Sequence, residues 1–219
     1  MASISVPADA SASAADILVI AAHPAMEHSR VNRRLLRTAW KAGARVTVRD
    51  LYRLYPDYLI DVETEQAHLA AARLVVWQHP VYWYSMPPLM KLWVDEVLSF
   101  GWAYGPGGIA LRGKDVWLVA STGGPQDSYR PDSYNRYFFD AFLPPYEQSA
   151  ALCGMRFLPP MVLHGAHRAS EADIAAHAAV YAERLASYPQ WPELDELPGC
   201  VACEVPTEAR PAGALEKAA

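Results

Sequence analysis

The 219-residue sequence contains few cysteines, no cluster of basic residues and no long apolar run. Three cysteines, an odd number, do not suggest a disulfide framework and fit a reducing cytoplasm. The net charge is −5, without the basic face that phosphate contacts need, so we do not expect nucleic-acid binding. No apolar run reaches the roughly 18 residues of a membrane span, and the first residues lack the pattern of a secretory signal. We therefore expect a globular protein of the cytoplasm.

The sequence also lacks a recognisable metal-binding motif. His23, His79 and His164 each lie near the end of a predicted strand, which permits the hypothesis of a metal-dependent hydrolase, but their spacing matches no metal motif. Cys200 and Cys203 form a single CxxC without the two further ligands that zinc would need nearby. We predict no metal site and regard the CxxC as incidental.

Aromatic residues are abundant, by contrast, in the stretch at residues 78–91, which reads QHPVYWYSMPPLMK. It follows an apolar run at residues 74–77 that predicts a buried strand, and Pro87 and Pro88 then favour the start of a helix. Exposed rings are costly, so a loop with several rings and almost no charge suggests a binding surface for a flat, apolar ligand.

Strands and helices alternate along the middle of the chain. Apolar runs predict strands at residues 17–22, 45–51, 74–78, 115–121 and 156–164. Periodicity and capping residues predict helices at residues 29–43, 61–72, 87–97, 137–153 and 170–185. Strands that are apolar throughout and separated by helices indicate a parallel sheet covered on both faces. Five such strands predict an α/β fold with a doubly wound, flavodoxin-like sheet in the order 2-1-3-4-5.

The two ends of the chain differ in composition from this middle part. Residues 1–15 are rich in Ala and Ser without periodicity, which predicts a disordered N-terminal arm. Residues 189–219 collect Pro, Ala and Glu and are interpreted as a C-terminal tail without a core. One ordered domain is therefore expected at residues 16–188.

The predicted sheet also predicts where a ligand binds. In sheets of this order, ligands bind outside the carboxyl ends of the strands, at the point where the strand order reverses. That rule brings together the loops after strands one, three and four, at residues 23–32, 80–84 and 121–129. The aromatic loop is the middle one of the three.

The first of these loops can be interpreted in two ways. It leads into the N-terminus of a helix, where free backbone N–H groups and the helix dipole favour an anion, with His23, Ser29 and Asn32 as nearby polar groups. One interpretation is a phosphate site. The other is that Ser29 only caps the helix and Asn32 lies in its first turn, and these residues alone favour it.

The other two loops leave alternatives open as well. Tyr82, Trp83 and Tyr84 could border a planar ring, pack on the core beneath the loop, or form a subunit interface, and we expect at least one ring to have one of the last two roles. Gly123 and Gly124 would let the backbone approach a ligand, and their N–H groups could stabilise a negative charge. An ordinary turn after a strand would explain the same two glycines.

Taken together, these residues resemble the flavodoxin-like NAD(P)H:quinone oxidoreductases, and the nearest branch is the ancillary oxidoreductases of glutathione-regulated potassium-efflux systems. The resemblance covers about residues 17–188, and its central stretch is the most specific part. The matching segments are AHP at residues 22–24 with Ser29 and Asn32, LYPD at 54–57, WQHPVYWYSMPPLMKLW at 77–93, GWAYG at 101–105, STGG at 121–124 and LPP at 158–160.

The resemblance implies a flavin held without a covalent bond, FMN because the nearest branch uses it, with FAD as the alternative. It implies three sets of cofactor-binding residues, one in each loop. The phosphate would be held by His23, Ser29, Arg30, Val31 and Asn32, the isoalloxazine would be bordered by Pro80, Val81, Tyr82 and Trp83, and its polar edge would be reached by Ser121, Thr122, Gly123 and Gly124. The strand-end rule had grouped the same loops, so the phosphate interpretation becomes the favoured one.

The resemblance also implies a reaction, a two-electron ping-pong hydride transfer. NAD(P)H would reduce the flavin and leave, and a quinone or similar planar electrophile would then take the electrons in the same slot. Tyr129, as a hydrogen-bond donor, and Tyr104, as a residue lining the cleft, are the catalytic candidates. Asn135 stands where mammalian-type members carry a histidine, and an amide cannot act as a general acid. The family also implies a homodimer with its sites at the subunit interface.

A second hypothesis is a regulatory role. The resemblance to the ancillary branch, together with Asn135, suggests an ancillary subunit of a glutathione-gated potassium-efflux transporter that has little turnover of its own. Such a subunit would be cytoplasmic and peripheral at the inner face of the cell membrane.

Overall fold

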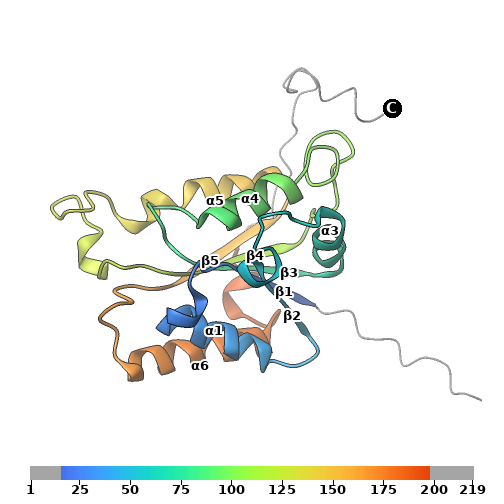
Figure 1. The fold of residues 1–219 in the computed structure, drawn as a ribbon. Helices are drawn as coiled ribbons and strands as arrows, with labels where there is room; N and C mark the ends of the chain where they lie inside the picture. The colour runs from blue at the N-terminus through green and yellow to red at the C-terminus, as the bar shows by residue number, and fades with distance from the viewer. Residues whose placement is uncertain (1–15, 198–219) are drawn as a thin grey trace, which may run out of the picture.

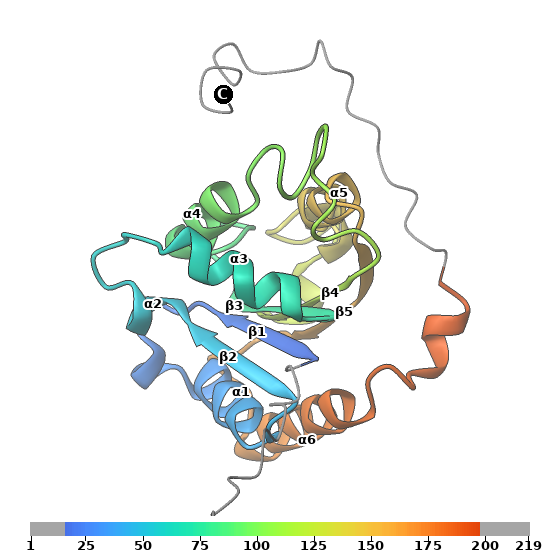
Figure 2. The same ribbon diagram turned by 90° about the vertical axis from the view of Figure 1, so that its right-hand side faces the viewer.

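A parallel five-stranded sheet forms the centre of the molecule in the computed structural model, which describes residues 16–197 (Figure 1, Figure 2). The strands are β1 (Ile17–Ala21), β2 (Val46–Asp50), β3 (Leu74–Pro80), β4 (Asp115–Ser121) and β5 (Arg156–Leu163), in the order β2-β1-β3-β4-β5. Every neighbouring pair is parallel. The flavodoxin-like sheet predicted from the sequence is therefore confirmed.

Helices cover both faces of this sheet (Figure 1). One face carries α1 (Arg30–Trp40) and α6 (Glu171–Ser187), and the other carries α3 (Val62–Ala71), α4 (Pro88–Val97) and α5 (Pro144–Leu152). The short elements are α2 (Leu51–Leu54) and the 3-10 turns η1 (Met26–His28), η2 (Gln126–Ser128), η3 (Phe139–Phe142) and η4 (Pro192–Asp195). Between residues 16 and 197, no helix is long and apolar enough to cross a membrane.

Two apolar cores, one on each side of the sheet, hold these layers together. Successive residues of a strand point to opposite faces, so each strand contributes to both cores. In β1, Leu18 and Ile20 pack into the core shared with α4 and α5, whereas Ile17 and Val19 pack into the core shared with α1 and α6. Burial on both faces explains why the strands appear in the sequence as continuous apolar runs.

The helices begin where the sequence places capping residues. Ser29 Oγ accepts the N–H of Asn32 at 3.1 Å at the start of α1. Ser170 and Asp173 form a reciprocal capping box at the start of α6, and Pro88 occupies the first turn of α4. These caps determine which backbone N–H groups stay free at the helix starts.

One predicted helix, at residues 137–153, is wrong in its extent. Only η3 is helical between Tyr137 and Leu143, and the α-helix starts at Pro144. A longer helix would place Pro144 and Pro145 in its interior, where proline removes a hydrogen bond and clashes with the preceding turn. The two prolines instead occupy the first turn of α5, which tolerates them.

The packed part of the chain extends beyond residue 188, where the sequence predicted a tail. Trp191 and Leu194 are 4% and 7% exposed and belong to the core beneath α1 and α6. The domain boundary predicted at residue 188 is therefore too early. The proline-rich composition of this segment suggested a tail, although two of its apolar residues are buried. Residues 1–15 and 198–219, with Cys200 and Cys203, lie outside the described residues.

Candidate functional site

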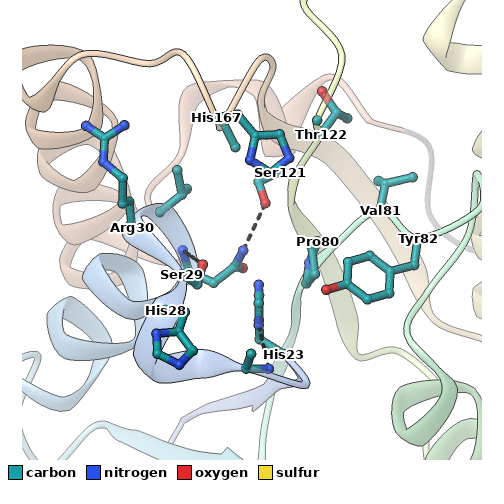
Figure 3. Close-up of a pocket in the computed structure, with 15 residues that line it drawn as sticks. His23, His28, Ser29, Arg30, Pro80, Val81, Tyr82, Ser121, Thr122 and His167 are labelled. Atoms are coloured by element: carbon teal, nitrogen blue, oxygen red, sulfur yellow. Dashed lines mark hydrogen bonds between the residues drawn. The ribbon is translucent and has the colours of Figure 1, made fainter.

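The loops that follow β1, β3 and β4 meet around one pocket at the carboxyl edge of the sheet (Figure 3). The pocket has a volume of about 340 Å³ and lies where the chain order reverses between β1 and β3. The predicted cofactor-binding residues that line it are His23, Ser29, Arg30, Val31, Asn32, Pro80, Val81, Tyr82, Ser121, Thr122 and Gly123. The structure thus brings together residues separated by about half of the chain.

The start of α1 presents hydrogen-bond donors to this pocket. The N–H groups of Arg30 and Val31 have no acceptor among the described residues. His23 Nδ1 accepts the N–H of Ala25 at 3.1 Å, so the neutral ring carries its proton on Nε2. Burial lowers the pKa of His23, against a smaller opposing effect of Glu27, and the ring is therefore neutral at pH 7. Uncharged donors at a helix N-terminus suit an anion such as a phosphate.

The guanidinium of Arg30 does not add to these donors. It points toward α6, where its Nη2 lies 2.6 Å from Oε1 of Glu171 (Figure 3). Both side chains are exposed, so the pair contributes little stability. The anion-binding character of this end of the pocket therefore rests on the backbone.

A buried amide joins the elements behind the pocket. Asn32 is 2% exposed, and its Nδ2 donates to Ser121 Oγ at 2.9 Å, which links α1 to β4. Gln78 Nε2 donates to the carbonyl oxygen of Asn32, and the Tyr181 hydroxyl donates to Gln78 Oε1, both at 3.2 Å. Asn32 Oδ1 is buried without a partner in the described chain, although buried acceptors are normally paired. That oxygen is free to accept a hydrogen bond from a ligand.

Two hydrogen bonds orient the peptide groups at the end of β3. The His79 ring is fully buried, and its Nδ1–H donates to the Pro80 carbonyl oxygen at 3.0 Å. Because a carbonyl only accepts, His79 Nε2 is the unprotonated nitrogen, and it has no partner within residues 16–197. The Val81 N–H donates to the Ser121 carbonyl oxygen at 2.7 Å. The second loop is thereby held against the third.

The rings of the aromatic loop point in different directions. Tyr82 points into the pocket and meets His23 edge-on, with ring centroids 6.2 Å apart (Figure 3). Tyr84 stacks on Phe142 with centroids 4.9 Å apart but is 44% exposed, so a core or interface role for one of the three rings stays a prediction. Trp83 is 93% exposed and does not line the pocket of the single chain. Its contact with a flavin stays a prediction.

The two glycines of the third loop have different surroundings. Gly123 lines the pocket, its N–H has no acceptor in the described part of the chain, and a Cβ there would lie 3.3 Å from His167 Nε2. Gly124 does not line the pocket, and a Cβ there would lie 2.7 Å from Ser128 Oγ and 2.8 Å from Tyr134 Oη. Gly123 therefore leaves space at the pocket wall, whereas a side chain at Gly124 would have to displace the ends of the Ser128 and Tyr134 side chains.

Neither predicted catalytic tyrosine lines the pocket of the single chain. Tyr129 is 7% exposed and meets Phe139 edge-on, with centroids 5.4 Å apart. Tyr104 packs edge-on against Phe100, in the loop after α4, with centroids 5.7 Å apart. Their catalytic roles stay predictions.

Four residues of the pocket wall were not singled out from the sequence: Ala25, His28, Ala166 and His167. Ala25 and His28 fall within the predicted loop at residues 23–32 but belong to no recognisable motif. Ala166 and His167 follow β5, whose carboxyl end lies on the same edge of the sheet. The strand-end rule, extended to the fifth strand, would have found that loop.

The histidines at the strand ends do not form a metal site. No group of three or more His, Cys, Asp or Glu side chains between residues 16 and 197 is arranged to hold a metal ion. His79 is buried in the core with Nδ1 bonded to Pro80, so it cannot join His23 and His164 in one coordination sphere. The metal-dependent hydrolase hypothesis has no support in this geometry.

The model of a family described by its flavodoxin-like fold matches residues 15–185. The ancillary protein KefF of the glutathione-regulated potassium-efflux system of Citrobacter koseri is 45% identical over 172 residues, covering 78% of this chain and 96% of the relative. The protein of the same name from Klebsiella aerogenes is 47% identical over 169 residues, covering 77% and 94%.

Solved structures with the same fold carry several functional names. The general stress protein 14 of Treponema denticola, in complex with FMN, is 37% identical with a TM-score of 0.73, covering 78% of this chain and 97% of that one. A thermophilic tryptophan halogenase from Streptomycin violaceusniger is 43% identical with a TM-score of 0.73, covering 76% and 96%. A presumed quinone reductase from Klebsiella pneumoniae is 26% identical with a TM-score of 0.66, covering 80% and 85%.

Proposed function

The chain belongs to the family with the flavodoxin-like fold, and from that membership we propose that it is a flavin-dependent oxidoreductase that reduces quinones with NAD(P)H. The observation that carries the proposal is the convergence of three distant loops on one pocket whose wall holds unpaired N–H groups at the start of α1. The FMN complex of the T. denticola relative supports FMN as the cofactor, with FAD as the alternative.

The residues of the pocket fit the chemical groups of FMN. The N–H groups of Arg30 and Val31, with the Nε2–H of His23, would hold the phosphate. The unpaired Asn32 Oδ1 would accept a hydrogen bond from a ribityl hydroxyl or ring N–H, which would satisfy an otherwise orphaned buried oxygen. The N–H of Gly123 would donate to the polar edge of the isoalloxazine.

The reaction that this assignment implies is a two-electron ping-pong transfer. When bound, the flavin would supply the redox chemistry, taking hydride from NAD(P)H and passing it to a quinone or similar planar electrophile. The chain would orient the reactants: Tyr82 lines the pocket against His23, and Val81 is fixed by its bond to Ser121. The halogenase among the similar structures shows that one fold hosts more than one reaction, so the acceptor has to be tested directly.

The decisive experiment is the visible spectrum of the purified full-length protein, before and after titration with FMN and FAD. We expect a yellow protein that releases FMN on denaturation and whose bound flavin is bleached by NAD(P)H and restored by a quinone. A colourless protein that takes up neither flavin would rule the proposal out. Bleaching without restoration by any quinone would retain the flavoprotein and exclude the proposed acceptor.

A regulatory role is the second candidate, favoured by the names of the relatives. The two KefF proteins are called ancillary to a potassium-efflux system, and this chain covers more than nine-tenths of their length. We propose that a potassium-efflux membrane protein is a partner and that the protein is cytoplasmic and peripheral to the membrane. Co-purification with such a transporter and undetectable NAD(P)H oxidation would favour regulation, and brisk quinone turnover by the isolated protein would contradict a purely regulatory role.

We also propose a homodimer. Trp83, Tyr134, Tyr137 and Phe138 are each more than half exposed, and a second copy would cover them. Trp83, Tyr104 and Tyr129, which do not line the pocket of one chain, would then complete the site at the interface. Sedimentation equilibrium measures the mass directly, and a monomer at micromolar concentration would contradict this part of the proposal.

A further inference from the structure

One polar contact connects the pocket to a second groove on the outer surface. Thr122 is 1% exposed and lines the pocket, and its Oγ1 lies 3.0 Å from Nδ1 of His164. The His164 ring, directly after β5, also lines an open groove against α6 with a volume of about 500 Å³. A half-buried imidazole therefore stands between solvent and a buried hydroxyl of the pocket wall.

The partners of Thr122 determine which nitrogen of His164 carries the proton. The Thr122 hydroxyl donates to the carbonyl oxygen of Gly124 at 2.8 Å, because a carbonyl can only accept. Oγ1 is then left to accept, so His164 Nδ1 is the donor in the 3.0 Å contact. A neutral imidazole carries one proton, which leaves His164 Nε2 as an acceptor. Burial lowers the pKa of His164 and keeps the ring neutral at pH 7.

The Thr122 hydroxyl can turn away from the acceptor that it has in the structure. Its proton lies on the Gly124 carbonyl oxygen, and rotation about the C–O bond lets a hydroxyl donate to another acceptor instead. A hydroxyl that receives a proton at Oγ1 from His164 can therefore pass its own proton on. The Tyr129 ring lies against His164, with centroids 5.4 Å apart.

We propose that His164 and Thr122 form a proton relay from the groove against α6, here called the outer groove, into the pocket. This inference rests on the proposed quinone reduction. Reduction of a quinone to a quinol requires two electrons and two protons. NAD(P)H supplies both electrons and one proton as hydride, so solvent must supply the second proton.

Each turnover moves one proton along the relay. His164 Nε2 takes a proton from water in the outer groove, and Nδ1 releases its own proton to Thr122 Oγ1. The hydroxyl proton of Thr122 passes to the oxygen of the acceptor that has received the hydride. Exchange with water then returns His164 to its Nδ1–H form.

The other titratable groups of the outer groove do not offer this path. His177 Nε2 is buried without a hydrogen-bond partner in the described structure. The Asp173 carboxylate accepts the Ser170 hydroxyl at 2.6 Å and is occupied by its capping box. His177→Gln is therefore a matched control for His164→Gln, since both variants exchange an imidazole of one groove for an amide.

The first test reads the proton position without turnover. Long-range ¹H–¹⁵N spectra of the full-length protein as purified should show His164 with its proton on Nδ1. Thr122→Val, which removes the acceptor at nearly constant volume, should abolish that preference, and Thr122→Ser should retain it. A wild-type His164 with its proton on Nε2 would overturn the relay.

The second test separates the two half-reactions in anaerobic stopped-flow measurements of the flavin-loaded protein. His164→Gln should leave bleaching by NAD(P)H unchanged and slow re-oxidation by a quinone on the order of 100-fold, the typical contribution of a positioned acid. Thr122→Val should slow the same step, and His177→Gln should not. The solvent isotope effect on re-oxidation should be larger in wild type than in His164→Gln.

The outcomes distinguish the relay from the function on which it rests. If NAD(P)H does not bleach the wild-type flavin, the proposed function falls and the relay falls with it. If wild type is bleached and re-oxidised, and His164→Gln is re-oxidised at the same rate, the relay alone is overturned.

Discussion

Ser29 shows how one side chain can serve both the fold and the pocket. Its hydroxyl accepts the N–H of Asn32, and this cap holds the first turn of α1, whose free N–H groups face the pocket. We expect Ser29→Ala to lower the free energy of unfolding by about 1 kcal/mol, the usual loss for a cap. FMN affinity should fall as well, because the donors of Arg30 and Val31 lose their fixed position. Urea unfolding and FMN titration measure the two effects.

Asp61→Ala provides the control for this prediction. Asp61 caps α3 through the N–H of Thr64, on the opposite face of the sheet and away from the pocket wall. Its loss should destabilise the fold through the same mechanism without changing FMN affinity. Equal loss of affinity in both variants would show that the effect of Ser29→Ala is only general destabilisation.

His79 makes stability depend on pH. Burial lowers the pKa of His79 from its ordinary value of 6.5 to about 4. The unfolded chain therefore binds a proton between pH 6.5 and pH 4 that the folded chain does not bind, and the free energy of unfolding falls as the pH falls through that window. The full effect is roughly 3 kcal/mol, complete below pH 4 and absent above pH 6.5.

The matched variant for this pH effect is His79→Asn. Its side-chain amide can still donate to the Pro80 carbonyl oxygen, as Nδ1–H does in the wild type. Urea unfolding at pH 7.5 and pH 5 should show a smaller pH-dependent loss in the variant than in wild type. Burial also lowers the pKa values of His23, His164 and His177, so these residues should leave a residual slope. An unchanged slope in His79→Asn would contradict the assignment.

At the scale of whole elements, the aromatic loop contains a strained turn. Tyr82 and Ser85 exchange two backbone hydrogen bonds, and Trp83 and Tyr84 between them have φ values of 49° and 64°. A two-residue turn with positive φ at both positions normally takes Asn-Gly, and a bulky residue there costs about 1 kcal/mol or more. Tyr84 gains a stacking contact with Phe142, whereas Trp83 gains no packing in the single chain.

Trp83→Asn should therefore stabilise the isolated chain. We expect the free energy of unfolding to rise by about 1 kcal/mol, since Asn adopts positive φ with little strain. If a flavin, an acceptor or a second copy covers Trp83, the same variant should bind that partner less tightly. Unfolding measured below the dimer dissociation constant, alongside sedimentation and FMN titration, separates the two effects. Lower stability at that dilution would contradict the strain argument.

Helix α1 carries four arginines on one stripe, at positions 30, 33, 34 and 37. Residues three and four apart on a helix are neighbours, so these like charges repel each other. Arg34→Glu should raise the free energy of unfolding by about 0.5 kcal/mol at low ionic strength. The gain should nearly vanish in 1 M NaCl, where the screening length falls to about 3 Å. A gain that survives high salt would point to helix propensity rather than charge.

Among the helices and strands, those buried on both sides could be predicted well from the sequence. Strands buried on both faces are apolar throughout, and β3 and β4 were found for that reason. The helix predicted at residues 137–153 failed because aromatic residues at 137–142 resemble a buried stripe, while Tyr137 and Phe138 are 60% and 59% exposed. Apolar periodicity cannot distinguish a surface that faces the core from one that faces solvent or a partner.

For the whole molecule, topology predicted the position of the pocket better than side-chain chemistry did. The order of the strands placed three loops on one edge, which requires only a parallel sheet and its reversal point. It could not tell that Tyr82 points inward and Trp83 outward, because Trp83 is the first residue of the two-residue turn that follows Tyr82. His167 was missed for a similar reason, since its loop follows an edge strand and contains no motif. Backbone direction at turns is the part that local sequence patterns leave open.

The C-terminal segment packs far from the pocket, so its contribution to the stability of the fold can be measured separately from ligand binding. Trp191 packs against Trp117, with centroids 4.9 Å apart, and its Nε1 donates to the Arg184 carbonyl oxygen at 2.9 Å. Nearby, Arg156 and Asp115 pair at the first residues of β5 and β4, so this cluster lies at the amino ends of the strands, opposite the pocket.

Trp191→Ala should therefore destabilise the fold and leave the pocket intact. Truncating a buried tryptophan leaves a cavity and costs about 3 kcal/mol. Trp40→Ala is the control, because Trp40 is 49% exposed and its truncation should cost far less. Both variants should bind FMN with wild-type affinity at 15 °C, where the folded state still dominates. A loss of FMN affinity in Trp191→Ala, with the protein shown to be folded by circular dichroism, would mean that the amino edge of the sheet communicates with the carboxyl edge through the strands.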